Sequence, residues 1–98
     1  MKRFQVYFLE CSDGTIYTGV TSQLHIRLWQ HETGFHPESY TAKRLPVRLL
    51  GHIPFSNAMD AIRFEKQVKK WRASKKRAIA FGNVLDVHFL AKKYTERK

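Results

Sequence analysis

The chain has 98 residues, of which 43% are hydrophobic, and this is enough for one compact domain with a modest core. Its 18 Lys and Arg residues outnumber its 8 Asp and Glu residues, so the formal net charge is +10. Such an excess favours a polyanionic partner, because each cation that contacts a phosphate releases condensed counterions. Nucleic acid is therefore the leading partner class. No apolar run is long enough to span a bilayer, and we expect no membrane partner.

Cysteine usage and the N-terminal segment bear on the compartment. Cys11 is the one cysteine, which excludes an internal disulfide framework and a Cys-rich zinc site. The N-terminus has no long apolar stretch followed by a small-residue cleavage site, so we expect a cytoplasmic protein. With no repeat or linker in view, we expect a single domain over residues 1–98, with a core at about 3–83 and a C-terminal helix at about 84–94.

The first elements form a predicted β-hairpin. Phe4–Leu9 and Ile16–Val20 are rich in aromatic and β-branched residues, and Ser12-Asp13-Gly14 supplies a turn between them.

The length of that turn decides which residues share a face. If Ser12, Asp13 and Gly14 form a three-residue loop with a bulge at Gly14, Leu9 pairs with Tyr17 and Tyr7 pairs with Gly19. A two-residue loop would put the two tyrosines on opposite faces. We predict the three-residue loop, with Tyr7 and Tyr17 on one face and space over Gly19 for the ring of Tyr7 or for a phosphate.

A helix follows the hairpin. Ser22 can cap it, it extends to about Thr33, and Gly34 ends it. Arg27 and His31 lie one turn apart on the same face of this helix. Both could lie over the edge of the core. Alternatively, the guanidinium of Arg27 binds a phosphate, and His31 assists as a second donor or a proton carrier.

The segment from Phe35 to Leu45 has no periodicity and is a predicted loop. Its aromatic, hydroxyl and cationic side chains can contact bases or phosphates, although a solvated connector would have a similar composition. The predicted nucleic-acid contacts in this loop are Tyr40, Thr41, Lys43 and Arg44.

Alternation returns from Val47 to Ile53, which predicts a third strand that stops before Pro54. Asn57 forms the start of a predicted helix that extends to about Trp71. Ser74 can cap a shorter helix ending at Gly82, and an amphipathic helix is predicted from Val84 to Lys93. The cationic run in this region can be a solvated face or a surface for the phosphate backbone, and we predict phosphate-backbone contacts for four of its lysines: Lys69, Lys70, Lys75 and Lys76.

Glu65 lies within the apolar side of the helix that Asn57 opens, where a carboxylate needs an explanation. One explanation is an exposed edge position, with Glu65 paired to Lys69 at i+4. The other is a ligand for a hard divalent metal, because Mg²⁺ accepts one or two carboxylates and completes its shell with water and substrate phosphate.

Taken together, these residues resemble the GIY-YIG nuclease superfamily. The first motif reads Val6-Tyr7-Phe8 and the second reads Tyr17-Thr18-Gly19, followed by Arg27, Glu65 and Asn83. The similarity covers most of the chain and is closest to the small standalone bacterial members, and the chain is also similar to the N-terminal catalytic domain of the nucleotide excision-repair nuclease. In two places the motifs differ from the common pattern: valine replaces the first glycine, and threonine replaces an aliphatic residue.

The resemblance implies an α+β fold, with a small three-stranded antiparallel sheet flanked by helices. It implies that Glu65 binds a divalent metal, Mg²⁺ or Mn²⁺, and that Arg27 grips the scissile phosphate. One tyrosine of Tyr7 and Tyr17 would help to activate water, and the other would orient water or phosphate. The supporting residues would be Gly19, His31 and Asn83.

We therefore expect a metal-dependent endonuclease that hydrolyses phosphodiester bonds in nucleic acid, DNA rather than RNA, in the context of DNA repair or recombination with a larger partner. The alternative is a non-catalytic nucleic-acid-binding module that keeps the fold. A basic structural or ribosome-associated protein is a third hypothesis.

Overall fold

The computed structural model describes residues 3–81, so Asn83 and the helix expected at 84–94 lie outside the described residues. The elements follow one another in the order β1 (Phe4–Glu10), β2 (Ile16–Thr21), α1 (Leu24–Thr33), the short 3₁₀ helix η1 (Ala42–Arg44), β3 (Arg48–Phe55), α2 (Ala58–Lys69) and α3 (Ala73–Phe81). Within residues 3–81, every helix is too short or too polar to span a lipid bilayer.

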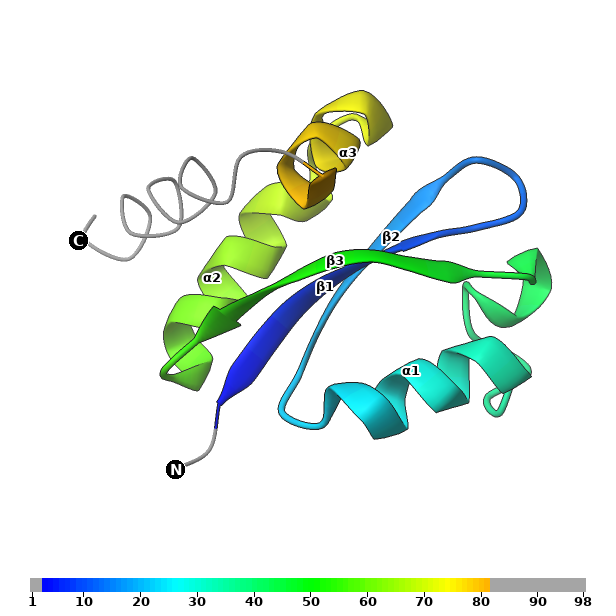
Figure 1. Ribbon diagram of the computed structural model, residues 1–98, viewed down its shortest axis with the longest axis horizontal. Helices are drawn as coiled ribbons and strands as arrows, with labels where there is room; N and C mark the ends of the chain where they lie inside the picture. Colours follow the sequence, from blue (N-terminus) through cyan, green and yellow to red (C-terminus); the bar gives the residue numbers. More distant parts are fainter. Residues whose placement is uncertain (1–2, 82–98) are drawn as a thin grey trace.

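The three strands form one antiparallel sheet in the order β2-β1-β3, so the fold is the α+β arrangement predicted from the sequence. Helix α1 covers one face of this sheet, and α2 with α3 covers the other (Figure 1). Strand alternation produces both cores: Val6 and Phe8 pack toward α2, whereas Tyr7 and Leu9 pack toward α1.

The hairpin has the predicted register. Leu9 pairs with Tyr17, Tyr7 pairs with Gly19, and Gly14 has a φ of 86° in the left-handed region that favours glycine. The three-residue loop therefore places Tyr7 and Tyr17 on the same face of the sheet.

The third strand continues beyond the predicted end, through Pro54 to Phe55. The prediction was wrong because it treated proline as a strand terminator. Among residues 3–81, strand β3 pairs with β1 alone and lies at the edge of the sheet, where a residue without an N–H group is tolerated.

Helix starts were predicted with mixed success. Asn57 caps α2 as expected: its Oδ1 accepts a hydrogen bond from the backbone N–H of Asp60 at 2.9 Å. The predicted cap at Ser22 is wrong, because α1 begins at Leu24 after Gln23, whose side chain makes no capping bond. Helix α3 begins at Ala73, one residue before the predicted cap Ser74.

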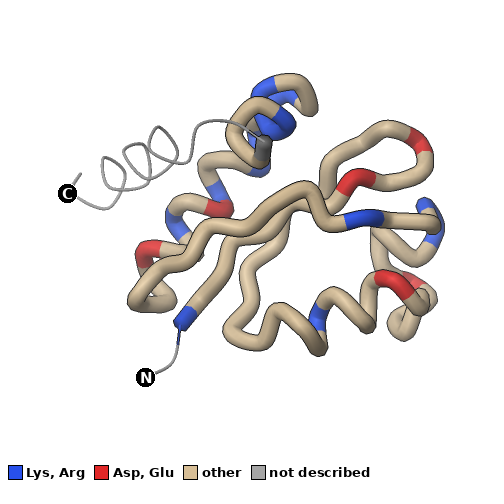
Figure 2. The backbone as a smooth tube through the Cα atoms, viewed as in Figure 1, with Lys and Arg blue, Asp and Glu red and all other residues tan. Residues whose placement is uncertain are grey.

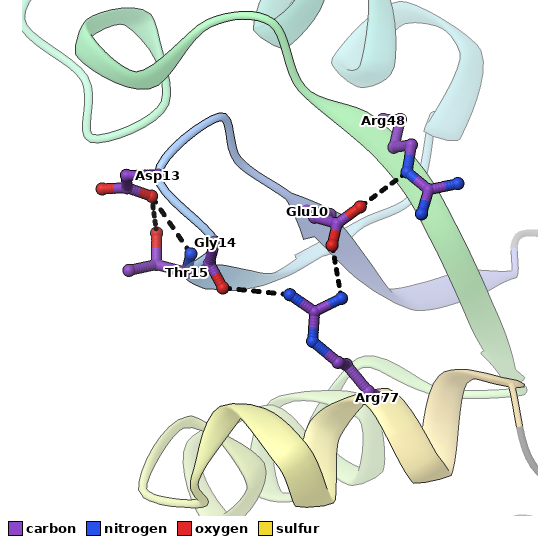
Figure 3. Close-up of polar contacts among 6 residues, drawn as sticks. All are labelled: Glu10, Asp13, Gly14, Thr15, Arg48 and Arg77. Atoms are coloured by element: carbon purple, nitrogen blue, oxygen red, sulfur yellow. Dashed lines mark hydrogen bonds and ion pairs between the residues drawn. The ribbon is translucent and has the colours of Figure 1, made fainter.

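Helix α3 is fastened to the hairpin by an arginine. Nη1 of Arg77 contacts the carboxylate of Glu10, and Nη2 donates to the carbonyl of Gly14 at 3.1 Å (Figure 3). The other carboxylate oxygen of Glu10 accepts a hydrogen bond from Nε of Arg48 at 2.6 Å. Both arginines lower the pKa of Glu10, that of Arg77 most strongly. Side chains from both α3 and β3 therefore hold the turn end of the hairpin.

Candidate active site

Tyr7 is the centre of the candidate site. It lies on the central strand and is buried, and its hydroxyl oxygen is 2.8 Å from Nε2 of His31 on α1. The ring reaches across Gly19 on the neighbouring strand: a Cβ atom added to Gly19 would lie 2.5 Å from Cζ of Tyr7. The glycine of the second motif is therefore required by the position of the tyrosine of the first motif.

His31 joins this tyrosine to the loop after α1. Its Nδ1 is 2.7 Å from the hydroxyl oxygen of Thr41, which is fully buried. The ring of Tyr17 lies 5.1 Å from the ring of His31 and 6.3 Å from that of Tyr7, between centroids. Three rings and one hydroxyl from four segments of the chain thus meet beneath α1.

The pKa of Tyr7 is raised to about 12, first because the phenol is buried and second because Tyr17 lies near it. The guanidinium of Arg27 lowers this pKa and the carboxylate of Glu65 raises it, so both charges act at the hydroxyl of Tyr7. The phenol therefore keeps its proton at neutral pH. Arg27 is itself oriented by a hydrogen bond from Nη1 to Oε1 of Gln30, at 2.8 Å.

The pKa of His31 is lowered to about 4, first by burial and then by electrostatic effects of the neighbouring Arg27 and His36. His31 is therefore neutral at pH 7, with one ring nitrogen that donates and one that accepts. A neutral imidazole can accept a hydrogen bond from the hydroxyl of Tyr7 on one side and donate one to Thr41 on the other, and at a pKa of about 4 it is a weak base.

Glu65 projects from α2 and is 6% exposed, as its helical phase indicates. Its Oε2 is 2.7 Å from Nζ of Lys69, one turn further along α2. The predicted pair with Lys69 exists, but the carboxylate does not lie at an exposed edge. A metal ion at Glu65 would have one protein carboxylate, and this donor set fits Mg²⁺, which keeps several waters and takes substrate phosphate as a ligand.

The predicted nucleic-acid contacts lie in different environments. Tyr40 is 42% exposed and stacks on Tyr17 with 5.9 Å between centroids. The guanidinium of Arg44 lies over the ring of Tyr40 and its Nε donates to Asp13. Lys43, Lys70 and Lys75 are exposed, whereas Thr41 and Lys76 are buried.

Comparison with protein families identifies the family of the chain. The model of the GIY-YIG catalytic domain matches residues 3–78, which include both tyrosine motifs, Arg27 and Glu65. The chain belongs to the GIY-YIG catalytic domain family. This is a family of nuclease domains, and the GIY-YIG fold brings Tyr7, Arg27 and Glu65 of this member within electrostatic reach of one another.

Similar GIY-YIG proteins carry the name UPF0213. One from Cupriavidus pinatubonensis is 36% identical over 80 residues, covering 82% of this chain and 86% of the relative. One from Streptococcus agalactiae is 46% identical over 65 residues, covering 66% of this chain and 73% of the relative. The solution structure of a UPF0213 protein from Bacillus halodurans is similar with a TM-score of 0.50 and 36% identity, covering 79% of this chain and 81% of that one.

Two features of the site were not predicted from the sequence. The role of Thr41 as the partner of His31 was missed, because a threonine in a loop without periodicity has no signal that points to a particular histidine. The burial of Lys76 was missed because it follows Lys75 in a cationic run that looks uniformly solvated. The spacing of Arg27 and His31 was the informative signal, since it placed both on one helix face.

Proposed function

We propose that this protein is a divalent-metal-dependent endonuclease that hydrolyses phosphodiester bonds in DNA. The observation that carries the proposal is the buried contact between Tyr7 and His31, which lies beside the charges of Arg27 and Glu65. A proton-transfer group, a phosphate-binding cation and a carboxylate that can hold a metal ion each promote hydrolysis of a phosphodiester.

The proton of the attacking water passes to the hydroxyl of Tyr7 as Tyr7 gives its own proton to Nε2 of His31. With a pKa of about 12, Tyr7 is protonated at neutral pH and acts as a relay, whereas His31, with a pKa of about 4, is neutral and a weak base, so the imidazolium forms only transiently. Thr41 accepts a hydrogen bond from Nδ1–H in this tautomer and stabilises the imidazolium that forms. Tyr17, which is partly exposed, orients the water or the phosphate.

Arg27 binds the scissile phosphate, because a guanidinium offers paired donors to phosphate oxygens and offsets the charge that develops in the transition state. Glu65 would hold the metal, Mg²⁺ or Mn²⁺, which as a Lewis acid would stabilise the negative charge that develops during hydrolysis. The ammonium of Lys69 lies on Oε2 of Glu65 and therefore competes with a metal ion for that carboxylate.

The nuclease family implies a nucleic-acid substrate. DNA is proposed over RNA from the similarity to the excision-repair nuclease domain, and the same similarity suggests a role in DNA repair in the cytoplasm beside a larger partner. Asn83, which lies outside the described residues, is proposed as a supporting contact.

Labelled branched, single-stranded and duplex DNA, with matched RNA, are incubated with the protein in Mg²⁺ or Mn²⁺. We expect cleavage of DNA that falls at least about 100-fold in Glu65→Gln and in Arg27→Met, the size of effect seen when a group that stabilises the transition state is removed. Lys66→Met, which alters an exposed lysine on the same helix, is the control. Cleavage that survives both substitutions, or salt-sensitive binding with no cleavage, would support the non-catalytic binding module instead.

A further inference from the structure

A cavity lies next to the candidate active site, and the proposed chemistry assigns no role to it as a binding site. It has a volume of about 320 Å³ and opens between the start of β2 and the helices α2 and α3. Tyr17 lines this cavity and also contacts His31 in the candidate active site, so the cavity and the active site are adjacent. The cavity is lined by Ile16, Tyr17, Thr18, Tyr40, Lys69 and Lys76.

Lys76 is unusual in this wall because it is a lysine with only 8% exposure. Its ammonium has three donors, and within residues 3–81 the hydrogen bond found for it is to the carbonyl of Ile16, at 3.1 Å. Burial and the nearby charge of Lys69 lower its pKa, against the opposing effect of Glu65. Two cations that face one cavity, one of them with donors to spare, form a site for an anion.

Thr18 provides an independent observation. Its hydroxyl oxygen is buried and has no hydrogen-bond partner in the part of the chain that the structure describes. A buried hydroxyl without a partner is destabilising, and such groups in native proteins call for an explanation. Since Thr18 and Lys76 line the same cavity, an anion there would give the ammonium of Lys76 a further acceptor, and rotation about χ1 of Thr18 would bring its buried hydroxyl to the same anion.

We propose that this cavity binds the backbone phosphate next to the scissile one, through the ammonium of Lys76 and the hydroxyl of Thr18. The inference rests on the proposed nuclease function, because Tyr17 connects the cavity to the site where the strand would be cut. Lys69, once released from Glu65, adds a second cation to the same phosphate. A subsite of this kind fixes the direction in which the strand crosses the catalytic residues.

The test measures binding and not cleavage. A fluorescent single-stranded DNA oligonucleotide is titrated into Glu65→Gln protein without divalent metal, and the dissociation constant is followed by anisotropy at several salt concentrations. We expect Lys76→Met to weaken binding about tenfold and to reduce the slope of log Kd against log salt by about 0.7, the value for one phosphate contact on a single strand. Lys76→Arg, which keeps a cation, should restore most of the affinity. Lys66→Met is the matched control and should change neither quantity by more than the experimental error.

The variant Thr18→Val distinguishes a loss of DNA binding from a loss of folding. The hydroxyl has no partner in the described residues, so this variant should unfold at the same or a higher urea concentration and yet bind the oligonucleotide about threefold more weakly, the loss of a neutral hydrogen bond. Equal affinities for Lys76→Met and Lys66→Met would overturn the proposal.

The same titrations separate two sources of phosphate. Oligonucleotides with a 5′-phosphate and with a 5′-hydroxyl should show the same loss in Lys76→Met, because the cavity takes a phosphate within the strand. A loss seen only with the phosphorylated end would overturn the proposal in favour of a site for chain termini. Absence of cleavage by the unaltered protein, with the Lys76 effect on binding intact, would contradict the proposed function and leave the subsite standing.

Discussion

Gly19 determines where the hydroxyl of Tyr7 can lie. A methyl group at this position would meet the phenol ring at 2.5 Å, a distance that forces the ring to move. We expect Gly19→Ala to lower the free energy of unfolding by about 1–3 kcal/mol, as overpacking does, and to reduce kcat at least about 100-fold because Tyr7 loses its contact with His31. Urea unfolding and single-turnover cleavage measure the two effects.

Gly14→Ala is the matched control for this substitution. Gly14 also needs its glycine, but for a φ of 86° and not for space, and no atom lies within 4 Å of an added Cβ. This variant should lose a similar amount of stability and keep its cleavage rate under folded conditions. If Gly19→Ala cleaves as fast as Gly14→Ala, the position of Tyr7 over Gly19 does not matter to turnover.

His31 should make the stability of the fold sensitive to acid. Its pKa is lowered to about 4 from 6.5, so its contribution to stability is complete above pH 6.5 and is lost as the pH falls toward 4. Between about pH 7 and about pH 4.5 the unaltered protein should lose about 2–3 kcal/mol more than His31→Phe, measured by urea unfolding at each pH. Parallel curves for the two proteins would show that His31 carries no depressed pKa.

The positions of individual site residues could be predicted from the sequence where those residues belong to a helix or strand with a regular pattern. The phase of α2 singled out Glu65 as a carboxylate on the buried side, and the spacing along α1 placed Arg27 beside His31. The contact between His31 and Thr41 could not be predicted, because it depends on how the loop after α1 folds back, and no local pattern encodes that path.

The hairpin is the element that the sequence predicted best. Turn length and a glycine in the left-handed region fix the register of β1 and β2, since a shift of one residue would move every side chain to the opposite face. Strand β3 was predicted less well, because the tolerance for Pro54 depends on its place at the sheet edge. Edge or centre is a property of the sheet, not of the strand's own residues.

The ion pair between Lys69 and Glu65, one turn apart on α2, leads to a prediction about metal binding. Glu65 raises the pKa of Lys69, so the ammonium stays charged on the carboxylate proposed to hold the metal. Without nucleic acid, Lys69→Met should raise the affinity for Mn²⁺ about two- to fivefold, the strength of a partly exposed ion pair. Isothermal titration calorimetry measures it, with Lys70→Met as the control. A lower affinity in Lys69→Met would mean that Lys69 supports the metal site and does not compete for it.

The whole molecule carries its positive charge unevenly. Lys and Arg gather along α2 and α3, as Figure 2 shows. Composition predicted the excess but not its distribution: Arg77 is engaged with Glu10 and Arg44 with Asp13. Net charge therefore overstates the cations that are free to bind a polyanion. Lys70 and Lys75 are exposed, and the ammonium of Lys75 lies 4.2 Å from the ring centroid of Trp71 without an acidic partner among the described residues.

Binding of duplex DNA should consequently depend on salt through these exposed lysines. In Glu65→Gln protein without divalent metal, the double variant Lys70→Met, Lys75→Met should reduce the slope of log Kd against log salt by about 1.8, which is about 0.9 for each lost phosphate contact on a duplex. Their contacts hold the strand equally in the ground state and the transition state, so kcat at saturating substrate should stay unchanged in the double variant with an intact Glu65. Anisotropy at several salt concentrations gives the slope, and multiple-turnover cleavage gives kcat.

An unchanged slope would place the DNA on another face of the molecule, whereas a fall in kcat would mean that these lysines also position the reacting phosphate.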